Sequence, residues 1–389
     1  MTIRTHASHA PRIAVAGLSA RLVAQSATRA GLDVVALDVF GDRDTREHAH
    51  LWFDIAGDGL SIDRARLYDA LEQAAHLPRM LGLVVTSGLE PLTDELARAP
   101  RVPRFIGNGG EAAAVRNPRR FFALLDDAGI AHPEVRFTPP VERQGWLVKC
   151  PDGCGGTHIE QAEHVDETAP GAYFQRLSPG RSMSALFVAA RRETVVIGFA
   201  EQLSIPMGHL PFVHAGSIGP IDVMPTTAIR IVEAIETIVR KTNLTGLNSI
   251  DFLLDDDTFR VLEINARPSS TMALYEAARP DAWPRGLIGA HLDACLHGEL
   301  PRARCAQSTM LPMRAGQRVI FAPFTFTVSH ALSDACFSDP ACHDVPLAGT
   351  RIEAGMPVCT VSAIAPTLAR LHVELEREHA RILRSIQMD

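Results

Sequence analysis

One stretch, Asn248 to Pro268, constrains the fold of this chain most, because it reads as two strands joined by a tight turn. Residues 249–254 and 259–264 are apolar runs of strand-forming type, and residues 255–258 between them (DDDT) are turn formers. The stretch therefore predicts a β-hairpin, in which the pairing register decides which side chains share a face.

The register of this hairpin decides whether its polar side chains converge. If the loop is 256–258, Asp255 pairs with Phe259, and Asp251 lies opposite Glu263 with the side chains about 5 Å apart on one face. Asn265, two residues further on, joins the same face. A loop one residue shorter would place Asp251 and Glu263 on opposite faces.

Two carboxylates and an amide oxygen on one face suit a hard divalent cation, Mg²⁺ or Mn²⁺. Asp251, Glu263 and Asn265 are therefore the predicted metal ligands. The alternative is a solvated polar face. It is disfavoured because Glu263 stands between Leu262 and Ile264, where a merely soluble edge would rarely concentrate such groups.

The residues of this hairpin also carry a family resemblance. Asp251-Phe252, followed by residues 262–268 (LEINARP), resembles the metal-binding hairpin of the ATP-grasp superfamily of carboxylate–amine ligases. The resemblance implies an α/β chain with the ATP-grasp fold. We then expect an N-terminal doubly wound parallel-sheet domain at 1–116, the nucleotide- and metal-binding domain at 117–309, and a small β-rich C-terminal region with a final helix at 310–389.

Composition excludes several classes of protein. A chain of 389 residues with 46% hydrophobic residues can bury more than one core, and a net charge of -7 without basic clusters argues against nucleic-acid binding. No apolar run reaches the roughly 20 residues of a membrane span, and the first residues lack the apolar core of a signal peptide. We therefore expect a cytoplasmic protein that binds small molecules.

The seven cysteines follow no regular framework, which predicts reduced thiols. Cys336, Cys342 and His343 could be imagined as metal ligands, but their spacing is not that of a zinc finger or ribbon and a fourth ligand is not evident. Cys150 and Cys154 flank a predicted nucleotide loop, which suggests sensitivity to oxidation.

The N-terminal part predicts a βαβ unit. Residues 12–17 and 33–38 read as strands around a helix at 20–30, and further strands are expected at 81–85 and 104–106. A dinucleotide-binding domain is the rival interpretation. It fails because the segment after Gly17 (LSAR) lacks the second and third glycines of that fingerprint.

Residues 117–129 predict an amphipathic helix, with an asparagine cap, a first-turn proline and a closing glycine. The helix resembles the linker helix of the superfamily, where many relatives carry an aspartate–lysine pair. Asn117-Pro118 stands there instead. Arg119 or Arg120 could supply the charge, but such arginines are more often solvated, and we leave them out of the predicted site.

Lys149 ends a short strand and is the only lysine before Lys241. A loop with Gly153, Gly155 and Gly156 follows, and it could close its backbone amides over phosphates while the lysine neutralises charge. The alternative is an ordinary glycine-rich hairpin loop.

The resemblance assigns adenine recognition to a hinge at 172–177, where Gln175, Arg176 and Leu177 are the candidates. Relatives often place an acidic residue after the following glycine, but Arg181 stands here, so Glu201 is the predicted substitute for the ribose contact. Residues 214–220 read as a loop that borders the acceptor pocket or lies at the surface.

The C-terminal region reads as short strands at 318–323, 350–353 and 358–363, followed by an amphipathic helix. It resembles, more loosely, the β-rich C-terminal region of some ATP-grasp ligases. It could clasp the nucleotide domain or form a homodimer contact.

The resemblance implies a reaction in which ATP phosphorylates a carboxylate and an amine attacks the acylphosphate. Lys149 and Arg267 are the predicted catalytic residues, and a structural ion pair is the alternative for Arg267. The layout is similar to tyramine–glutamate ligases of methanofuran-type, one-carbon cofactor biosynthesis, in which Arg267 or Arg279 would hold the glutamate α-carboxylate. A carboxyphosphate-forming, carboxylase-like enzyme and a nucleotide-binding module without turnover are the alternatives.

Overall fold

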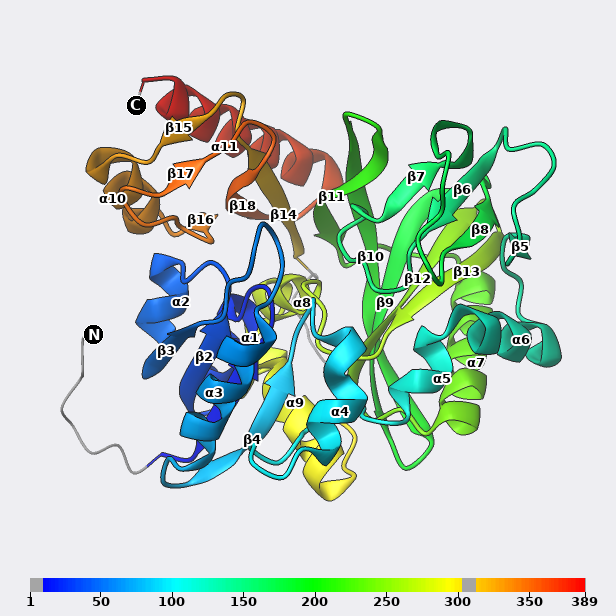
Figure 1. The fold of residues 1–389 in the computed structure, drawn as a ribbon, viewed down its shortest axis with the longest axis horizontal. Coiled ribbons are helices and arrows are strands. Elements are labelled where there is room, and N and C mark those ends of the chain that lie inside the picture. Colours follow the sequence, from blue (N-terminus) through cyan, green and yellow to red (C-terminus); the bar gives the residue numbers. More distant parts are fainter. Residues whose placement is uncertain (1–9, 303–312, 389) are drawn as a thin grey trace.

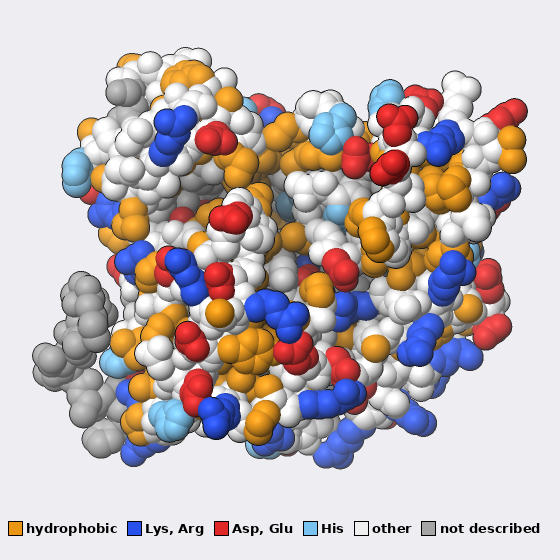
Figure 2. Space-filling model, viewed as in Figure 1, with side chains coloured by type: hydrophobic (Ala, Val, Ile, Leu, Met, Phe, Trp, Pro, Cys, Tyr) orange, Lys and Arg blue, Asp and Glu red, His pale blue; other side chains and the backbone are white. Residues whose placement is uncertain are grey.

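The computed structural model describes residues 10–302 and 313–388. These form three parts (Figure 1), and the space-filling view shows a hollow between them (Figure 2). The expectation about a signal peptide rests largely on residues 1–9, and the proposed domain boundary falls near residue 310. Both lie outside the described residues. In the described part, no helix is long and apolar enough to cross a membrane.

The N-terminal part is a parallel sheet in the order β3-β2-β1-β4, as predicted for a doubly wound domain. Its elements are β1 (Arg12–Ala16), α1 (Arg21–Arg29), β2 (Asp33–Asp38), α2 (Arg43–His48), β3 (Leu51–Asp54), α3 (Arg64–Ala75), β4 (Met80–Val85), η1 (Glu90–Leu92) and α4 (Thr93–Arg98). Side chains of β1 alternate between two cores, because Ile13 and Val15 pack with α1 while Ala14 and Ala16 pack with α3. The predicted strand at 104–106 is reduced to one bridge, Leu83 to Phe105.

Two helices, α5 and α6, lead into a small antiparallel sheet with the strand order β5-β8-β6-β7. The elements are α5 (Ala112–Arg116), α6 (Pro118–Ala128), β5 (Val135–Arg136), β6 (Trp146–Lys149), β7 (Ile159–Gln161), η2 (Ala162–His164) and β8 (Tyr173–Arg176). The predicted linker helix is confirmed as α6. The Asn117 side chain accepts the Arg120 N–H at 3.1 Å, and Gly129 ends the helix in the left-handed conformation at φ 66°.

A large sheet forms the centre of the molecule, in the order β13-β12-β9-β10-β11-β14-β18-β16. Its strands are β9 (Arg181–Ala190), β10 (Glu193–Met207), β11 (Leu210–Gly219), β12 (Gly246–Asp255), β13 (Thr258–Asn265), β14 (Arg314–Phe321), β16 (Cys342–His343) and β18 (Pro357–Ala365). Helix α7 (Pro225–Thr242) buries its apolar stripe in one core with Phe187 and Phe252. Residues 214–219, predicted as a loop, belong to β11 because they pair with β10 and β14.

In the C-terminal region, β14, β18 and β16 continue the central sheet. Its other elements are β15 (Phe326–Thr327), α10 (His330–Ser338), β17 (Arg351–Ile352) and α11 (Leu368–Met388), and the predicted stripe of α11 buries Leu371, Leu375, Ile382 and Ile386. Between the hairpin and this region lie α8 (Met272–Ala278), η3 (Pro280–Ala282), α9 (Gly286–Leu292) and η4 (Asp293–His297). The division at 310 remains a proposal.

Candidate active site

The hairpin β12–β13 brings Asp251 opposite Glu263 by a route the sequence did not indicate. Asp255 pairs with Thr258, so the loop is one residue shorter than predicted. That shorter loop alone would have separated the two carboxylates. A β-bulge at Leu262 restores the register, because Phe252 pairs with Val261 while Asp251 pairs with Glu263.

Asp251, Glu263 and Asn265 form one cluster on a single face of the central sheet. The Asn265 side-chain amide donates to Asp251 Oδ2 at 3.1 Å. Asp251 Oδ1 is buried and accepts no hydrogen bond among the described residues. Burial, and then the neighbouring charge of Glu263, raise the pKa of Asp251 to about 6. A buried, unsatisfied carboxylate oxygen beside a second carboxylate fits a divalent cation, which would supply the missing positive charge.

Lys149 faces this cluster from the small sheet. Its Nζ lies 3.8 Å from Glu263 Oε2, and its side chain is almost fully buried. Burial lowers the pKa of the Lys149 ammonium, but Tyr173 and Glu263 outweigh burial, so the pKa is raised. Lys149 therefore carries a fixed positive charge between the two sheets.

The hinge residues of β8 divide between the two faces of the small sheet. Gln175 shares the face of Lys149 and Tyr173, and its buried Nε2 has no hydrogen-bond partner among the described residues. The Arg176 side chain lies on the other face, over the Trp146 ring. The backbone N–H groups of Arg176 and Leu177 already donate to Glu134 O and Gly145 O, at 2.8 and 2.9 Å. Of the three predicted adenine contacts, only Gln175 has a buried side-chain donor without a partner among the described residues.

The structure does not bring Glu201 to this cluster. Glu201 pairs with Met183, which pairs with Phe252, whereas Asp251 pairs with Ser184, one residue along. Because adjacent residues of a strand face opposite ways, Glu201 lies on the face opposite Asp251. It pairs with Arg181 at 3.4 Å. Its neighbours in β10, Ala200 and Gln202, lie on the Asp251 face, and of these two only Gln202 has a polar side chain.

The glycine loop closes onto β11. The His214 N–H donates to Gly155 O at 2.9 Å. Gly155 and Gly156 have φ values of 62° and 75°, and a Cβ on Gly156 would strike the Phe212 carbonyl. Gly153 packs against the His158 side chain. The glycines therefore allow a close approach of backbone to backbone beside Lys149.

Arg267 lies beside the cluster and is held by an ion pair across the domains. Its Nε donates to Glu90 Oε1 at 2.6 Å, and its Nη2 donates to Asn265 Oδ1 at 3.1 Å. Burial raises the pKa of Glu90, but Arg267 outweighs burial, so the pKa is lowered and the pair stays ionised. Arg267 thus forms the structural ion pair that was the alternative prediction for it. The same contacts hold its guanidinium beside Asn265.

Arg116 is a functional candidate that the sequence reasoning missed. It lines a cleft of about 80 Å³ together with Glu263, Asn265, Arg267 and His158. Its Nη1 donates to Thr93 Oγ1 at 3.3 Å, its Nη2 lies 3.7 Å from Asp152 Oδ1 in the glycine loop, and its Nε is buried without a partner. The available signal was its position directly before Asn117, where the linker lysine was found to be absent.

The cysteines were predicted as free thiols, and no disulfide joins the described ones. The structure brings Cys336 and Cys342 together with Cys359 rather than with His343, and their sulfur atoms lie within 4.8 Å of one another. Cys150 and Cys154 flank the glycine loop as expected, and burial raises the pKa of both thiols. Raised pKa values argue against reactive thiolates at this loop.

Comparison with known proteins places this geometry in a family context. Residues 115–271 match the model of the ATP-grasp domain family. That segment contains Lys149, the glycine loop and the complete hairpin. A search of curated proteins found no match.

Solved structures resemble the whole chain at low sequence identity. An L-amino acid ligase from Bacillus licheniformis is 14% identical with a TM-score of 0.68, and 96% of each chain is covered. N5-carboxyaminoimidazole synthase from Aspergillus clavatus, in complex with ADP and its ribonucleotide, is 14% identical with a TM-score of 0.66, covering 97% of this chain and 99% of that one. The biotin carboxylase domain of Hydrogenobacter thermophilus 2-oxoglutarate carboxylase, with MgADP and bicarbonate, is 14% identical with a TM-score of 0.67, covering 91% and 86%.

Proposed function

We propose that this chain, which has the ATP-grasp fold and contains an ATP-grasp domain, is an ATP-dependent ligase that forms a C–N bond between a carboxylate and an amine. One observation carries the proposal. The Asp251–Glu263–Asn265 cluster of the central sheet faces Lys149 of the small sheet, with Nζ of Lys149 3.8 Å from Glu263. Acidic ligands and a buried cation on opposite walls of one cleft suit a nucleotide triphosphate with its metal.

Each residue of the cleft has a proposed part. Asp251, Glu263 and Asn265 would hold Mg²⁺ or Mn²⁺, which when bound neutralises phosphate charge. Lys149, and Arg116 in place of the absent linker lysine, would hold ATP phosphate oxygens. Gln175 would donate its unsatisfied amide to the nucleotide, and Gly153, Gly155 and Gly156 would close the loop over the phosphates. At Arg176 and Leu177 only the backbone carbonyl groups would remain to contact adenine, because both N–H groups are already used. For the ribose contact we propose Gln202 in place of Glu201.

The proposed reaction is the one that the family resemblance implies, and this arrangement suits it. A substrate carboxylate oxygen takes the γ-phosphoryl group of ATP, the bond to ADP breaks, and an acylphosphate forms. The amine nitrogen then attacks the acyl carbon, the C–O bond to phosphate breaks, and the nitrogen loses a proton. Arg267, held by Glu90 beside Asn265, is placed to stabilise the negative charge on the tetrahedral oxyanion and the leaving phosphate.

The finer assignment, glutamate with tyramine in one-carbon cofactor biosynthesis, stays a proposal that rests on sequence resemblance. So do Arg279 as a ligand for the glutamate α-carboxylate, a cytoplasmic location and a homodimer. A carboxyphosphate-forming enzyme is the second candidate, because one structural neighbour is a biotin carboxylase domain in complex with bicarbonate.

The experiment is a screen for ADP release with ATP and Mg²⁺. Carboxylates and amines are tested alone and in pairs, bicarbonate is a separate arm, and the Glu263→Gln variant is the background control. Release that needs both a carboxylate and an amine, with the amide detected by mass spectrometry, supports the ligase. Release with bicarbonate alone favours the second candidate. ATP binding without release under any condition contradicts both.

A further inference from the structure

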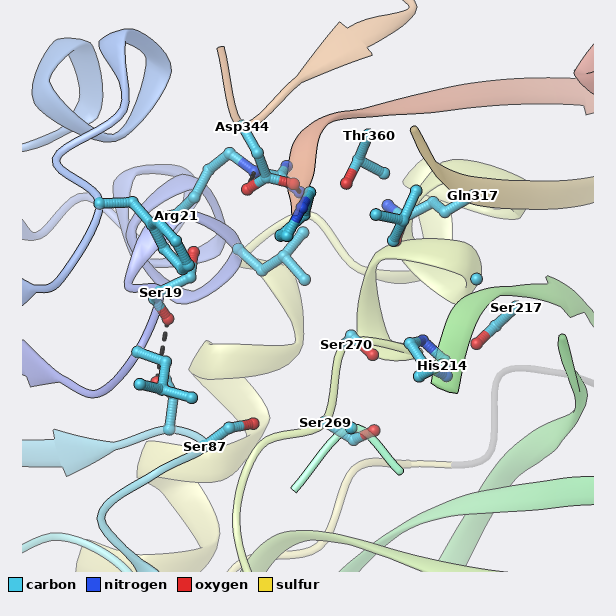
Figure 3. Close-up of a pocket in the computed structure, with 18 of the residues that line it drawn as sticks. Ser19, Arg21, Ser87, His214, Ser217, Ser269, Ser270, Gln317, Asp344 and Thr360 are labelled. Atoms are coloured by element: carbon cyan, nitrogen blue, oxygen red, sulfur yellow. Dashed lines mark hydrogen bonds and ion pairs between the residues drawn. The ribbon is translucent and has the colours of Figure 1, made fainter. Parts of the chain in front are cut away.

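A cavity of about 340 Å³ lies outside the Asp251–Glu263–Asn265 cluster, where the three parts of the chain meet (Figures 2 and 3). Its N-terminal wall comes from the carboxyl ends of parallel strands: Ser19 follows β1, Asp42 follows β2 and Ser87 follows β4. The chain reverses its strand order around β1, and ligands of open α/β sheets bind at such a switch point. The volume falls within the range of small-molecule pockets.

The opposite walls connect the cavity to the candidate active site. Gly155 of the glycine loop and Ser269 and Ser270, just after the hairpin, line it. Figure 3 shows Arg21 and Asp344 on one side of the cavity and Ser87 and Ser269 on another. A bound molecule could therefore extend from the Arg21–Asp344 side towards the end of the metal hairpin.

The charges on the Arg21 side do not balance. Three carboxylates, those of Asp42, Asp44 and Asp344, surround a single guanidinium, Arg21. Both oxygens of Asp344 accept from Arg21, at 2.5 and 3.0 Å. Both oxygens of Asp44 accept backbone N–H groups, those of Asp344 and Val345, at 2.9 and 3.1 Å. Asp344 is therefore the main ion-pair partner of Arg21, and this wall of the cavity has an excess of negative charge.

Asp42 is the carboxylate left over. Its residue is only 7% exposed, it lines the cavity, and within the described ranges its side chain makes no hydrogen bond or ion pair. Asp38, also buried, has three donors: the N–H groups of Ala20 and Gly41 and the indole of Trp52. Burial, and then the charges of Asp344 and Asp44, raise the pKa of Asp42, because the opposing charge of Arg21 is a smaller effect. An unpartnered buried carboxylate facing a cavity is the complement of a cationic ligand.

We propose that this cavity is an ammonium-binding pocket, in which Asp42 anchors a substrate that carries an ammonium group at one end and its reacting group at the other. The inference rests on the proposed ligase function and narrows its substrates to amino acids and diamines. The ammonium is held at Asp42, and the reacting carboxylate or second amine extends past Ser269 towards the hairpin. Hydroxyl groups of Ser19, Ser87 and Ser270 offer further hydrogen bonds. A monoamine such as tyramine has no second group to react when it is anchored in this way.

Thermal unfolding without nucleotide tests the binding directly. Glutamate is compared with glutarate, which lacks only the ammonium group, and putrescine is compared with butylamine, which lacks one of two amines. We expect glutamate or putrescine to raise the unfolding midpoint of the wild type. The partner compound should need at least a tenfold higher concentration to produce the same shift. Equal effects of both members in each pair would overturn the pocket, and this arm needs no variant. The pair that responds identifies the substrate class.

The variant arm uses Asp42→Asn, with the exposed Asp69→Asn of the same domain as the matched control. Asp42→Asn should abolish the ligand-induced shift and raise the KM of the ammonium substrate at least tenfold, with the KM of ATP within twofold. Its own midpoint without ligand should stay or rise, whereas loss of a purely structural carboxylate would lower it. An unchanged ligand shift in Asp42→Asn contradicts the inference. Discrimination between the paired compounds without any ADP release would contradict the ligase function and leave the pocket standing.

Discussion

Arg21 and Asp344, 323 residues apart in the chain, form a two-point ion pair that joins the N-terminal domain to the C-terminal region. The guanidinium is buried, and its Nε also lies 3.5 Å from Asp44 Oδ2. Asp44 in turn accepts the backbone N–H of Asp344 and of Val345. The C-terminal region, to which the sequence assigned no chemistry, thus fixes the position of a helix of the opposite domain.

Asp344→Ala should lower the free energy of unfolding by about 3 kcal/mol, because it leaves the buried Arg21 guanidinium without its main partner. The control is Asp334→Ala, which removes the more exposed ion pair of Arg43 between the same two parts, at 2.6 Å. The control should cost less than about 1 kcal/mol. Denaturant unfolding measures both, and equal costs would show that the buried pair has no special role.

Asp251→Asn and Glu263→Gln should each lower ATP turnover at least about a hundredfold, because a neutral amide neutralises little of the charge of a metal–phosphate complex. Folding should survive. Asp251→Asn removes a desolvated carboxylate and should keep or raise the unfolding midpoint. Binding of Mn²⁺, followed by electron paramagnetic resonance, gives a readout besides turnover. Near-normal turnover of either variant at saturating Mg²⁺ would show that the cluster is not the metal site.

Lys149→Ala should weaken ATP binding by about ten- to a hundredfold, the range expected for a lost hydrogen bond to a charged group. The glycine loop should still close, because its contact with β11 uses backbone atoms. Titration calorimetry with ATP measures the affinity. Lys241→Ala, at an exposed position near the end of α7, is the matched control and should bind ATP normally. Unchanged ATP affinity and turnover in Lys149→Ala would remove the lysine from the site.

Local chemistry predicted much of this fold. The linker helix could be predicted because its ends are set locally. An asparagine cap and a proline begin it at Pro118, and a glycine ends it at Gly129. The pairing of Asp251 with Glu263 was also predicted, but from the wrong loop. A bulge at Leu262 depends on packing across the whole sheet, and a pattern of alternating residues carries no sign of it.

Long-range placement accounts for what the sequence did not reveal. Glu201 was predicted as the ribose contact because relatives carry an acidic residue near this position, but the direction in which its side chain faces depends on pairing with β9. Residues 214–220, which contain two glycines, were predicted as a loop, although two neighbouring strands hold residues 214–219 in β11. The Asp42 pocket combines residues from both ends of the chain, so no local motif marks it.

Gly156→Ala should detach the glycine loop from β11 and lower ATP affinity. The new Cβ would meet the Phe212 carbonyl, and a φ of 75° disfavours any side chain. Gly155→Ala is the matched control, because its φ of 62° is similar but nothing lies within 4 Å of the added Cβ. The control should cost only the roughly 1 kcal/mol of the left-handed backbone. Hydrogen exchange at the His214 N–H reports loop closure, and equal exchange in both variants would contradict the steric argument.

Stability should fall with acid through His291, which is buried between the domains. Its Nδ1 accepts the Leu247 N–H at 2.9 Å and its Nε2 lies 3.2 Å from Ile106 O, so the neutral ring satisfies both partners. Burial lowers its pKa to about 4, below the roughly 6.5 of the unfolded chain. The unfolded chain therefore binds the proton first, and stability present above pH 6.5 is lost as the pH falls towards 4, by up to about 3 kcal/mol. His291→Asn keeps an acceptor for Leu247 without the titration, so its midpoint should be lower at pH 7 and should change less between pH 7 and pH 4.5. An unchanged pH dependence in this variant would assign the acid sensitivity to other groups.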